Sequence, residues 1–90
     1  MEFEWDAKKA AANVRKHEIS FPFAVQIFLD ENRTEKRDES DENYGEERWV
    51  TTGLVDEVEI VVVYTIRDEN IRIISARRAN SHERKAYWNR

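Results

Sequence analysis

The stretch ERWVTTGLVDEVEIVVVYTIRDENIRIISAR, residues 47–77, decides the fold of this 90-residue chain. Its centre, Val58–Ile66, is a dense run of β-branched residues that suits a central strand. Glu47–Leu54 is rich in Trp, Val and Thr, and Ile71–Arg77 alternates apolar with other residues. Turn-forming residues separate the three runs, so we predict an antiparallel meander. The turns are expected at Gly53 and Asp56 and at residues 68–70.

Ahead of this stretch, the chain carries signals for one short strand and a helix. Phe3–Trp5 reads as the strand, and Asp6 is placed to cap the helix by accepting its free amides. The helix itself is Ala7–His17, rich in Ala and Lys, which are good helix formers. Three residues at helical spacing are expected to face inward: Ala10, Val14 and His17.

A second helix is predicted over Phe21–Phe28, with Ser20 as its cap and Pro22 in its first turn, where a missing amide costs least. Its expected buried stripe is Phe21, Ala24 or Val25, and Phe28. The following segment, Asp30–Glu47, is highly charged and is interpreted as an exposed loop with a ragged edge strand near Arg33–Arg37. Such a loop is either a lid or partner contact, or an inert solvated segment.

After the meander, Asn80 with Glu83 three residues later predicts a capping box and a final helix. The element order indicates a single α+β domain over residues 1–90, with its helices packed on one sheet face. Trp5 and Trp49 are expected in the core because of their size.

Composition narrows the class of protein. The chain has no cysteine, and 40% of its residues are hydrophobic, enough for one core. The net charge is −4, yet residues 67–90 hold seven basic and three acidic side chains, which suggests a local anion site. Neither a secretory signal nor a membrane-spanning run is apparent, so we expect a cytoplasmic protein with no membrane contact. No nucleotide-binding or metal-protease motif is present, and we expect neither cofactor nor metal.

Several stretches together resemble the BrnT family of toxins from type II toxin–antitoxin systems. The most specific is the segment ISARRA, residues 74–79, which precedes a helix that carries Glu83, Arg84 and Tyr87. The other matching stretches are Phe3-Glu4-Trp5-Asp6 with Lys8 or Lys9, Asn13-Val14-Arg15-Lys16-His17, and Glu46-Glu47-Arg48-Trp49.

The resemblance implies a RelE-like fold and a ribonuclease that arrests growth. It also implies a BrnA-like antitoxin with a ribbon-helix-helix DNA-binding part, so that the toxin would reach operator DNA only through its antitoxin. Family members often carry a His-Ser pair shortly before the EERW-like segment, whereas this chain has Asp41-Glu42-Asn43-Tyr44 there. That departure would weaken activity or change its specificity if the histidine serves RNA cleavage in relatives.

RNA cleavage without a metal requires a base for the 2′-hydroxyl, a cation for the phosphoryl oxygens and an acid for the leaving oxygen. Arg77 and Arg78 are the best phosphate ligands, since a guanidinium fork matches phosphate oxygens. Strand alternation points them to opposite faces, so only one can contact the phosphate. The alternative is that both are structural and pair with glutamates.

The other candidates carry a structural alternative each. His17 suits acid–base work but equally suits a helix C-cap, and Lys9 and Lys16 either contact phosphate or are solvated. Glu83 and Tyr87 share a helix face; Glu83 is a base or a cap, and Tyr87 stacks on a base or donates a proton. The remaining substrate-binding candidates are Arg84 and Arg48; the alternative for Arg48 is an ordinary cross-strand pair with Glu47.

Three functions follow from these observations. The first is a metal-independent endoribonuclease toxin that forms a 2′,3′-cyclic phosphate. The second is a catalytically weak or inactive toxin homologue that acts as an antitoxin-binding co-repressor module, which the absent histidine and the acidic balance favour. The third is a direct nucleic-acid-binding domain, against which the lack of a basic stripe argues.

Overall fold

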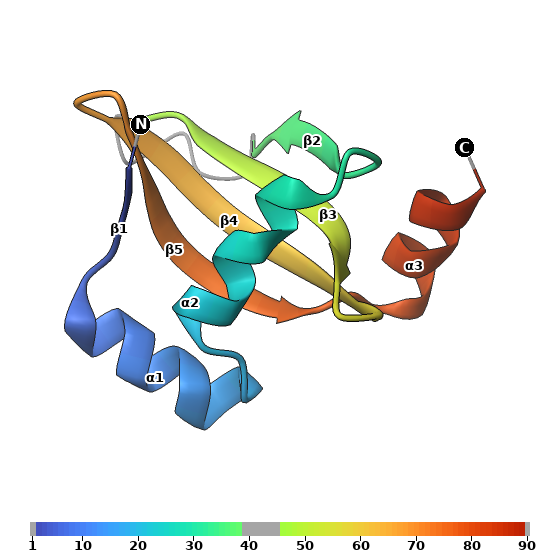
Figure 1. The fold of residues 1–90 in the computed structure, drawn as a ribbon, viewed down its shortest axis with the longest axis horizontal. Helices are drawn as coiled ribbons and strands as arrows, with labels where there is room; N and C mark the ends of the chain where they lie inside the picture. Colours follow the sequence, from blue (N-terminus) through green and yellow to red (C-terminus); the bar gives the residue numbers. More distant parts are fainter. Residues whose placement is uncertain (1, 39–45, 90) are drawn as a thin grey trace.

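The computed structural model describes residues 2–38 and 46–89. Within them, five strands form one sheet in the order β1-β5-β4-β3-β2 (Figure 1). The architecture is α+β, as predicted, with α-helices and one 3-10 segment beside a mixed sheet. The elements are β1 (Phe3–Glu4), α1 (Ala7–His17), α2 (Phe21–Ala24), η1 (Val25–Leu29), β2 (Thr34–Arg37), β3 (Arg48–Val55), β4 (Val58–Arg67), β5 (Asn70–Arg78) and α3 (Ser81–Trp88).

The predicted meander is confirmed, because β3, β4 and β5 pair antiparallel and β2 adds antiparallel to β3. The hairpin turns lie at Asp56–Glu57 and Asp68–Glu69, where all four residues have positive φ, between 46° and 67°. Positive φ at both central residues matches the right-handed twist of the flanking strands. Gly53 is not part of a turn, contrary to our prediction, but is buried inside β3.

The sheet is not antiparallel throughout, which corrects the sequence-based expectation. The first strand, β1, pairs parallel with β5, the last strand of the chain. The Glu2 carbonyl accepts from the Ile71 amide at 2.8 Å, and the Glu2 amide donates to Asn70 Oδ1 at 3.0 Å. This pairing joins the two ends of the chain, so no local pattern in the sequence could have revealed its direction.

The first helix begins and ends as its sequence predicts. The Asp6 carboxylate accepts from the amides of Lys8 and Lys9 at 2.7 and 3.2 Å, which holds its pKa below the ordinary value. Of its three predicted inward residues, Ala10 packs against the core and His17 is half-buried. The prediction for Val14 is wrong, because Val14 is 46% exposed and the buried residue is Asn13. A polar side chain is buried here because it bonds to buried backbone, as described below.

The second predicted helix is two elements. Ser20 caps α2 as expected, by accepting from the Phe23 amide at 3.2 Å, but the chain then tightens into the 3-10 turn η1. A 3-10 helix has three residues per turn, whereas an α-helix has 3.6. The buried stripe is therefore Phe21, Ala24 and Ile27, and it does not end at Phe28. Phe28 is half-buried and stacks against Phe3 instead.

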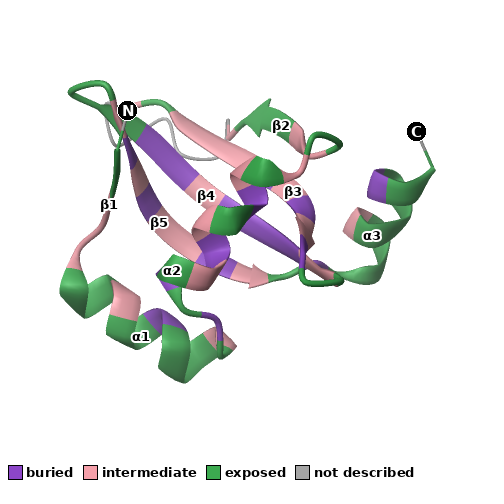
Figure 2. Cartoon of the chain, viewed as in Figure 1, coloured by how far each residue is buried: buried purple, intermediate pink, exposed green. Residues whose placement is uncertain are grey.

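The core lies between α1, α2 and η1 and one face of the sheet, where buried residues concentrate on β4 and β5 (Figure 2). Trp5 and Trp49 pack against this core but are only partly buried. The third helix, α3, lies apart from α1 and α2, beyond the end of β3 (Figure 1). The expectation that all helices pack on one sheet face is therefore wrong, because α3 bonds to side chains on the other face.

Candidate nucleic-acid interface

The sheet face opposite α1 and α2 carries a concentration of basic side chains. Strand register fixes its composition: Ile60 and Val62 face the core, so their neighbours Val61 and Val63 face the other way. We call this surface the basic face. Its members form adjacent rows across the strands, namely Arg48, Thr65 and Arg72; Lys36, Val50, Val63 and Ser75; and Thr52, Val61 and Arg77. Cations therefore border a floor of valine and threonine.

A β-bulge in β5 decides which arginines share this face. Val63 pairs with Ser75 and Tyr64 with Ile73, so Ile74 is the extra residue. Plain alternation would place Arg72 and Arg77 on opposite faces, because they are an odd number of positions, five, apart. The extra residue restores them to the same face, as bulges commonly do beside functional sites.

Arg77 is held by α3 through a two-pronged ion pair. Its Nη1 and Nη2 donate to Oε1 and Oε2 of Glu83, both at 2.7 Å. This pair raises the pKa of Arg77 and lowers that of Glu83. Glu83 Oε1 also accepts from the Asn80 amide at 2.8 Å, which completes the predicted capping box. Glu83 is therefore an anchored carboxylate that orients Arg77.

Arg78 lies on the opposite face, as strand alternation predicted. It pairs in register with the buried Ile60 and lines a groove of about 310 Å³ with Val14, Phe23 and Val58. The two adjacent arginines are thus separated by the thickness of the sheet. Of these two arginines, only Arg77 belongs to the basic face.

The first helix borders the basic face at the outer edge of β5. Asn13 replaces an edge strand there: its Nδ2 donates to the Ala76 carbonyl at 2.9 Å, and its Oδ1 accepts from the Ala76 amide at 3.1 Å. This contact sets α1 so that His17, Lys9 and Lys16 line a pocket of about 270 Å³ with Ser75. Ser75 also belongs to the basic face, so the pocket and the face adjoin.

The remaining candidates on α3 are engaged in structural contacts. Arg84 Nη1 donates to the Ala79 carbonyl at 2.8 Å, which ties α3 to the end of β5. Tyr87 is buried, and its hydroxyl donates to Asp30 Oδ2 at 2.5 Å. The same carboxylate oxygen accepts from the Leu54 amide at 2.9 Å, so Asp30 fastens α3 to β3.

The structure therefore brings together some of the predicted residues and separates others. Arg48 and Arg77 share the basic face, and Lys9, Lys16 and His17 border it, whereas Arg78 lies on the far side of the sheet. Sequence reasoning missed Arg72, whose guanidinium pairs with Glu4 at 3.2 Å, and Lys36. No periodic signal could have found Arg72, since the bulge that re-aims it is a property of the paired strands.

Two further findings concern residues 2–38 and 46–89. No helix in these ranges is both long enough and apolar enough to cross a bilayer. In the same ranges, no group of three or more His, Cys, Asp or Glu side chains is arranged to hold a metal ion. The segment Asp41–Tyr44, where relatives were expected to carry a His-Ser pair, lies outside the described residues.

Comparison with known proteins gives one family. No curated protein matches the chain. Residues 5–83 match the family described as the ribonuclease toxin, BrnT, of type II toxin-antitoxin systems. The match includes β2 to β5 and every cation of the basic face named above. Because it covers most of the 90 residues, the chain belongs to the BrnT family of ribonuclease toxins.

Proposed function

We propose that the protein cleaves RNA held on the basic face, with the phosphate of the scissile bond at Arg77. The single observation that carries this proposal is the convergence of Arg48, Arg72 and Arg77 on one sheet face, opposite the core. Arg77 is well oriented for this role because Glu83 holds its guanidinium from one side. A guanidinium fixed in this way stabilises charge on the phosphoryl oxygens without reorganising during the reaction.

The reaction that suits these residues uses the RNA's own 2′-hydroxyl. His17 takes the proton from that hydroxyl, and the 2′-oxygen attacks the phosphorus. The bond to the 5′-oxygen breaks, and that oxygen leaves with a proton from Lys9 or Lys16 of the same pocket. The products are a 2′,3′-cyclic phosphate and a free 5′-hydroxyl, with no metal or cofactor among the reactants.

Glu83 and Tyr87 are assigned supporting roles in this scheme. The ion pair with Arg77 keeps the Glu83 carboxylate ionised, and a weakly basic carboxylate is a poor acceptor for a hydroxyl proton. The Tyr87 hydroxyl already donates to Asp30, and burial of its ring leaves it little access to a phosphate. His17 remains the group whose chemistry and position fit proton transfer.

Membership of a type II system implies a protein antitoxin as partner. We propose that this partner is BrnA-like, with a ribbon-helix-helix DNA-binding part that carries the complex to operator DNA. The proposal extends to a RelE-like fold for the single domain and to the cytoplasm as its location. The order of a helix pair, a curved antiparallel meander and a final helix supports the fold assignment.

A second function is favoured by one specific observation. The Glu83 carboxylate beside Arg77 already accepts hydrogen bonds at both of its oxygens, which makes it a poor base. The overall charge of −4 also opposes RNA binding. A toxin homologue of this kind would retain antitoxin binding and act as a co-repressor while cleaving RNA slowly or not at all.

One experiment separates these functions. The purified chain is incubated with a labelled RNA in EDTA beside two matched variants, Arg77→Ala and Arg78→Ala. The nuclease proposal predicts that wild type and Arg78→Ala form a cyclic phosphate, while Arg77→Ala loses activity by about 100-fold or more, the loss typical of removing one preorganised donor. A folded wild type that leaves RNA intact, but still binds its antitoxin, would establish the co-repressor module instead.

A further inference from the structure

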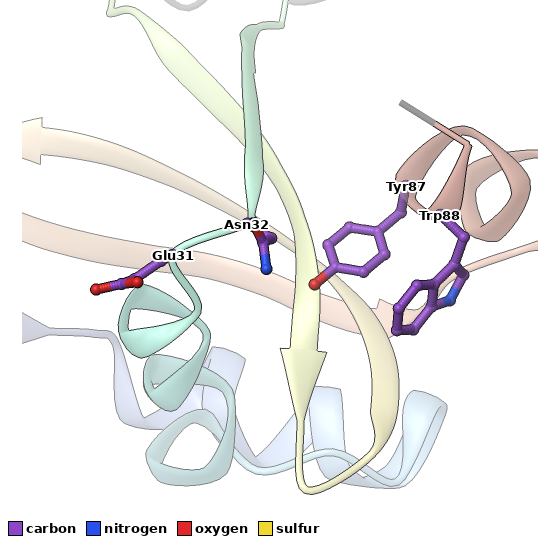
Figure 3. Close-up of a pocket in the computed structure, with 4 residues that line it drawn as sticks. All are labelled: Glu31, Asn32, Tyr87 and Trp88. Atoms are coloured by element: carbon purple, nitrogen blue, oxygen red, sulfur yellow. The ribbon is translucent and has the colours of Figure 1, made fainter.

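A pocket between α3 and the turn that precedes β2 lies outside the basic face. It has a volume of about 400 Å³ and is lined by Glu31, Asn32, Tyr87 and Trp88 (Figure 3). None of these residues contacts the scissile phosphate or moves a proton in the cleavage chemistry proposed above; Tyr87 has only a structural role there. We propose that this pocket binds one unpaired base of the RNA substrate, with the base stacked on Trp88. The proposal rests on the proposed ribonuclease function and adds a binding subsite to it.

Trp88 is presented as a stacking surface. Its side chain lies in the last turn of α3 and is 58% exposed, although indole rings are among the largest apolar groups in proteins. The ring is nevertheless fixed in place, because its Nε1 donates to Glu59 Oε2 at 2.9 Å. It also contacts the Tyr87 ring edge to face, with the ring centroids 4.9 Å apart. An exposed aromatic ring that is already ordered loses little entropy when a base stacks on it.

The opposite wall of the pocket is polar, and its backbone is held in place. The Asp30 side chain accepts from the Asn32 amide at 2.9 Å, which forms a local turn, and the Tyr87 hydroxyl donates to the same carboxylate. Figure 3 shows the Asn32 side chain across from the Tyr87 ring, with Trp88 beside that ring, while the Glu31 carboxylate points away from the rings. Asp30 therefore fixes the position of the Asn32 backbone relative to the Tyr87 ring.

The chemistry of this wall favours a base over a protein side chain. The side-chain carboxamide of Asn32 presents a donor and an acceptor side by side, the pattern that pairs with an adenine edge. Aromatic hot spots at protein interfaces are instead surrounded by contacts that exclude water, whereas here the remaining lining side chains are an amide and a carboxylate. Single-stranded RNA is commonly read by this combination of ring stacking and edge hydrogen bonds.

The pocket and the proposed phosphate site both involve residues of α3. Glu83, which holds Arg77, and Trp88 lie on the same helix, five residues apart, or about 7.5 Å along its axis. A strand whose phosphate contacts Arg77 could therefore extend its next bases toward Trp88. The short, rigid connection would fix the register between the scissile bond and the bound base.

The test uses a short 2′-O-methyl oligoadenylate, which cannot be cleaved, and the same oligomer with one abasic position. Binding is followed by NMR at the Trp88 indole N–H, which is assigned by its absence in Trp88→Phe. We expect this signal to shift with the complete oligomer. Trp88→Ala should weaken binding of that oligomer by about 5- to 100-fold, Trp88→Phe should retain most of it, and the effect of Trp88→Ala should shrink with the abasic oligomer.

Ile66→Ala serves as the matched control, because Ile66 is also an apolar residue that is 53% exposed. Ile66 lies near the end of β4, whereas Trp88 bonds to Glu59 near its start. It should bind both oligomers like wild type. The proposal is overturned if Trp88→Ala weakens both oligomers equally, if wild type binds neither, or if the indole signal responds only to the antitoxin. If Arg77→Ala leaves both affinities unchanged while the Trp88 effect depends on the base, the phosphate site fails and the pocket stands.

Discussion

Replacement of Asn13 by alanine should destabilise this protein far more than the same replacement at the neighbouring, exposed Val14. Asn13 makes three hydrogen bonds to buried backbone: its Nδ2 donates to the carbonyls of Ile19 and Ala76, and its Oδ1 accepts from the Ala76 amide. Their lengths are 2.8, 2.9 and 3.1 Å, all of ordinary strength. Alanine would leave those backbone groups without partners at an edge that no strand covers.

The expected loss follows from the groups left unpaired. An unsatisfied buried donor costs about 1–3 kcal/mol, and the two carbonyls add to this cost. Alanine is the better helix former by roughly 0.7 kcal/mol, which offsets part of the loss. We therefore expect the free energy of unfolding to fall by about 2–4 kcal/mol, a large share of the 5–15 kcal/mol typical of a domain.

Urea denaturation followed by tryptophan fluorescence and circular dichroism measures this loss. With a slope of about 1 kcal/mol/M, typical of small domains, the midpoint of Asn13→Ala should fall by ~2–4 M. Val14→Ala is the matched control, because Val14 is 46% exposed, and its midpoint should stay within about 0.5 M of wild type. Equal midpoints for the two variants would refute the reasoning that Asn13 replaces an edge strand.

Two further perturbations test the anchoring of α3 and the packing of β3. Glu83→Gln should remove stability that wild type has at neutral pH: the Arg77 pair lowers the pKa of Glu83 below its ordinary 4.5, so this contribution is complete well above pH 4.5 and is lost as pH falls below it. Chemical denaturation should therefore show a larger difference between wild type and Glu83→Gln at pH 7 than at pH 3, and an equal difference at the two pH values would contradict this role of the ionised carboxylate. Gly53→Ala should lower stability by about 1–3 kcal/mol, because its Cβ would lie 2.7 Å from Ile27 Cγ1; an unchanged thermal midpoint would contradict this.

Most of the local structure could be predicted from the sequence. The three strands of the meander, the caps at Asp6, Ser20 and Asn80, and the opposite faces of adjacent strand residues are all short-range consequences of residue type. They depend on side chains within a few positions of one another, as in a capping box or an alternating strand. The family resemblance on which the functional prediction depended also lay in contiguous segments, and the matched family confirms it.

The arrangement of the candidate site could not be predicted in this way. Arg72 joins Arg77 on one face only because β5 carries a bulge opposite β4, and a bulge depends on the partner strand. Buried Asn13 was overlooked because a polar residue inside a helix normally faces solvent, and its partner, the backbone of Ala76, is 63 residues away. Similarly, the ion pair between Arg77 and Glu83 forms only because α3 folds back over the end of the sheet.

The sequence by itself determined the meander strands, the helix caps, the turn positions near residues 56 and 68, and the family, because these follow from local propensity and contiguous pattern. Tertiary structure alone decided the parallel addition of β1 to β5, the placement of Arg72 and Arg77 on one sheet face, and the meeting of Trp88 with Asn32. The physical reason is the same in each case. These features are pairings between segments distant in the chain, whose direction and register are set by burial and hydrogen bonding in the assembled fold.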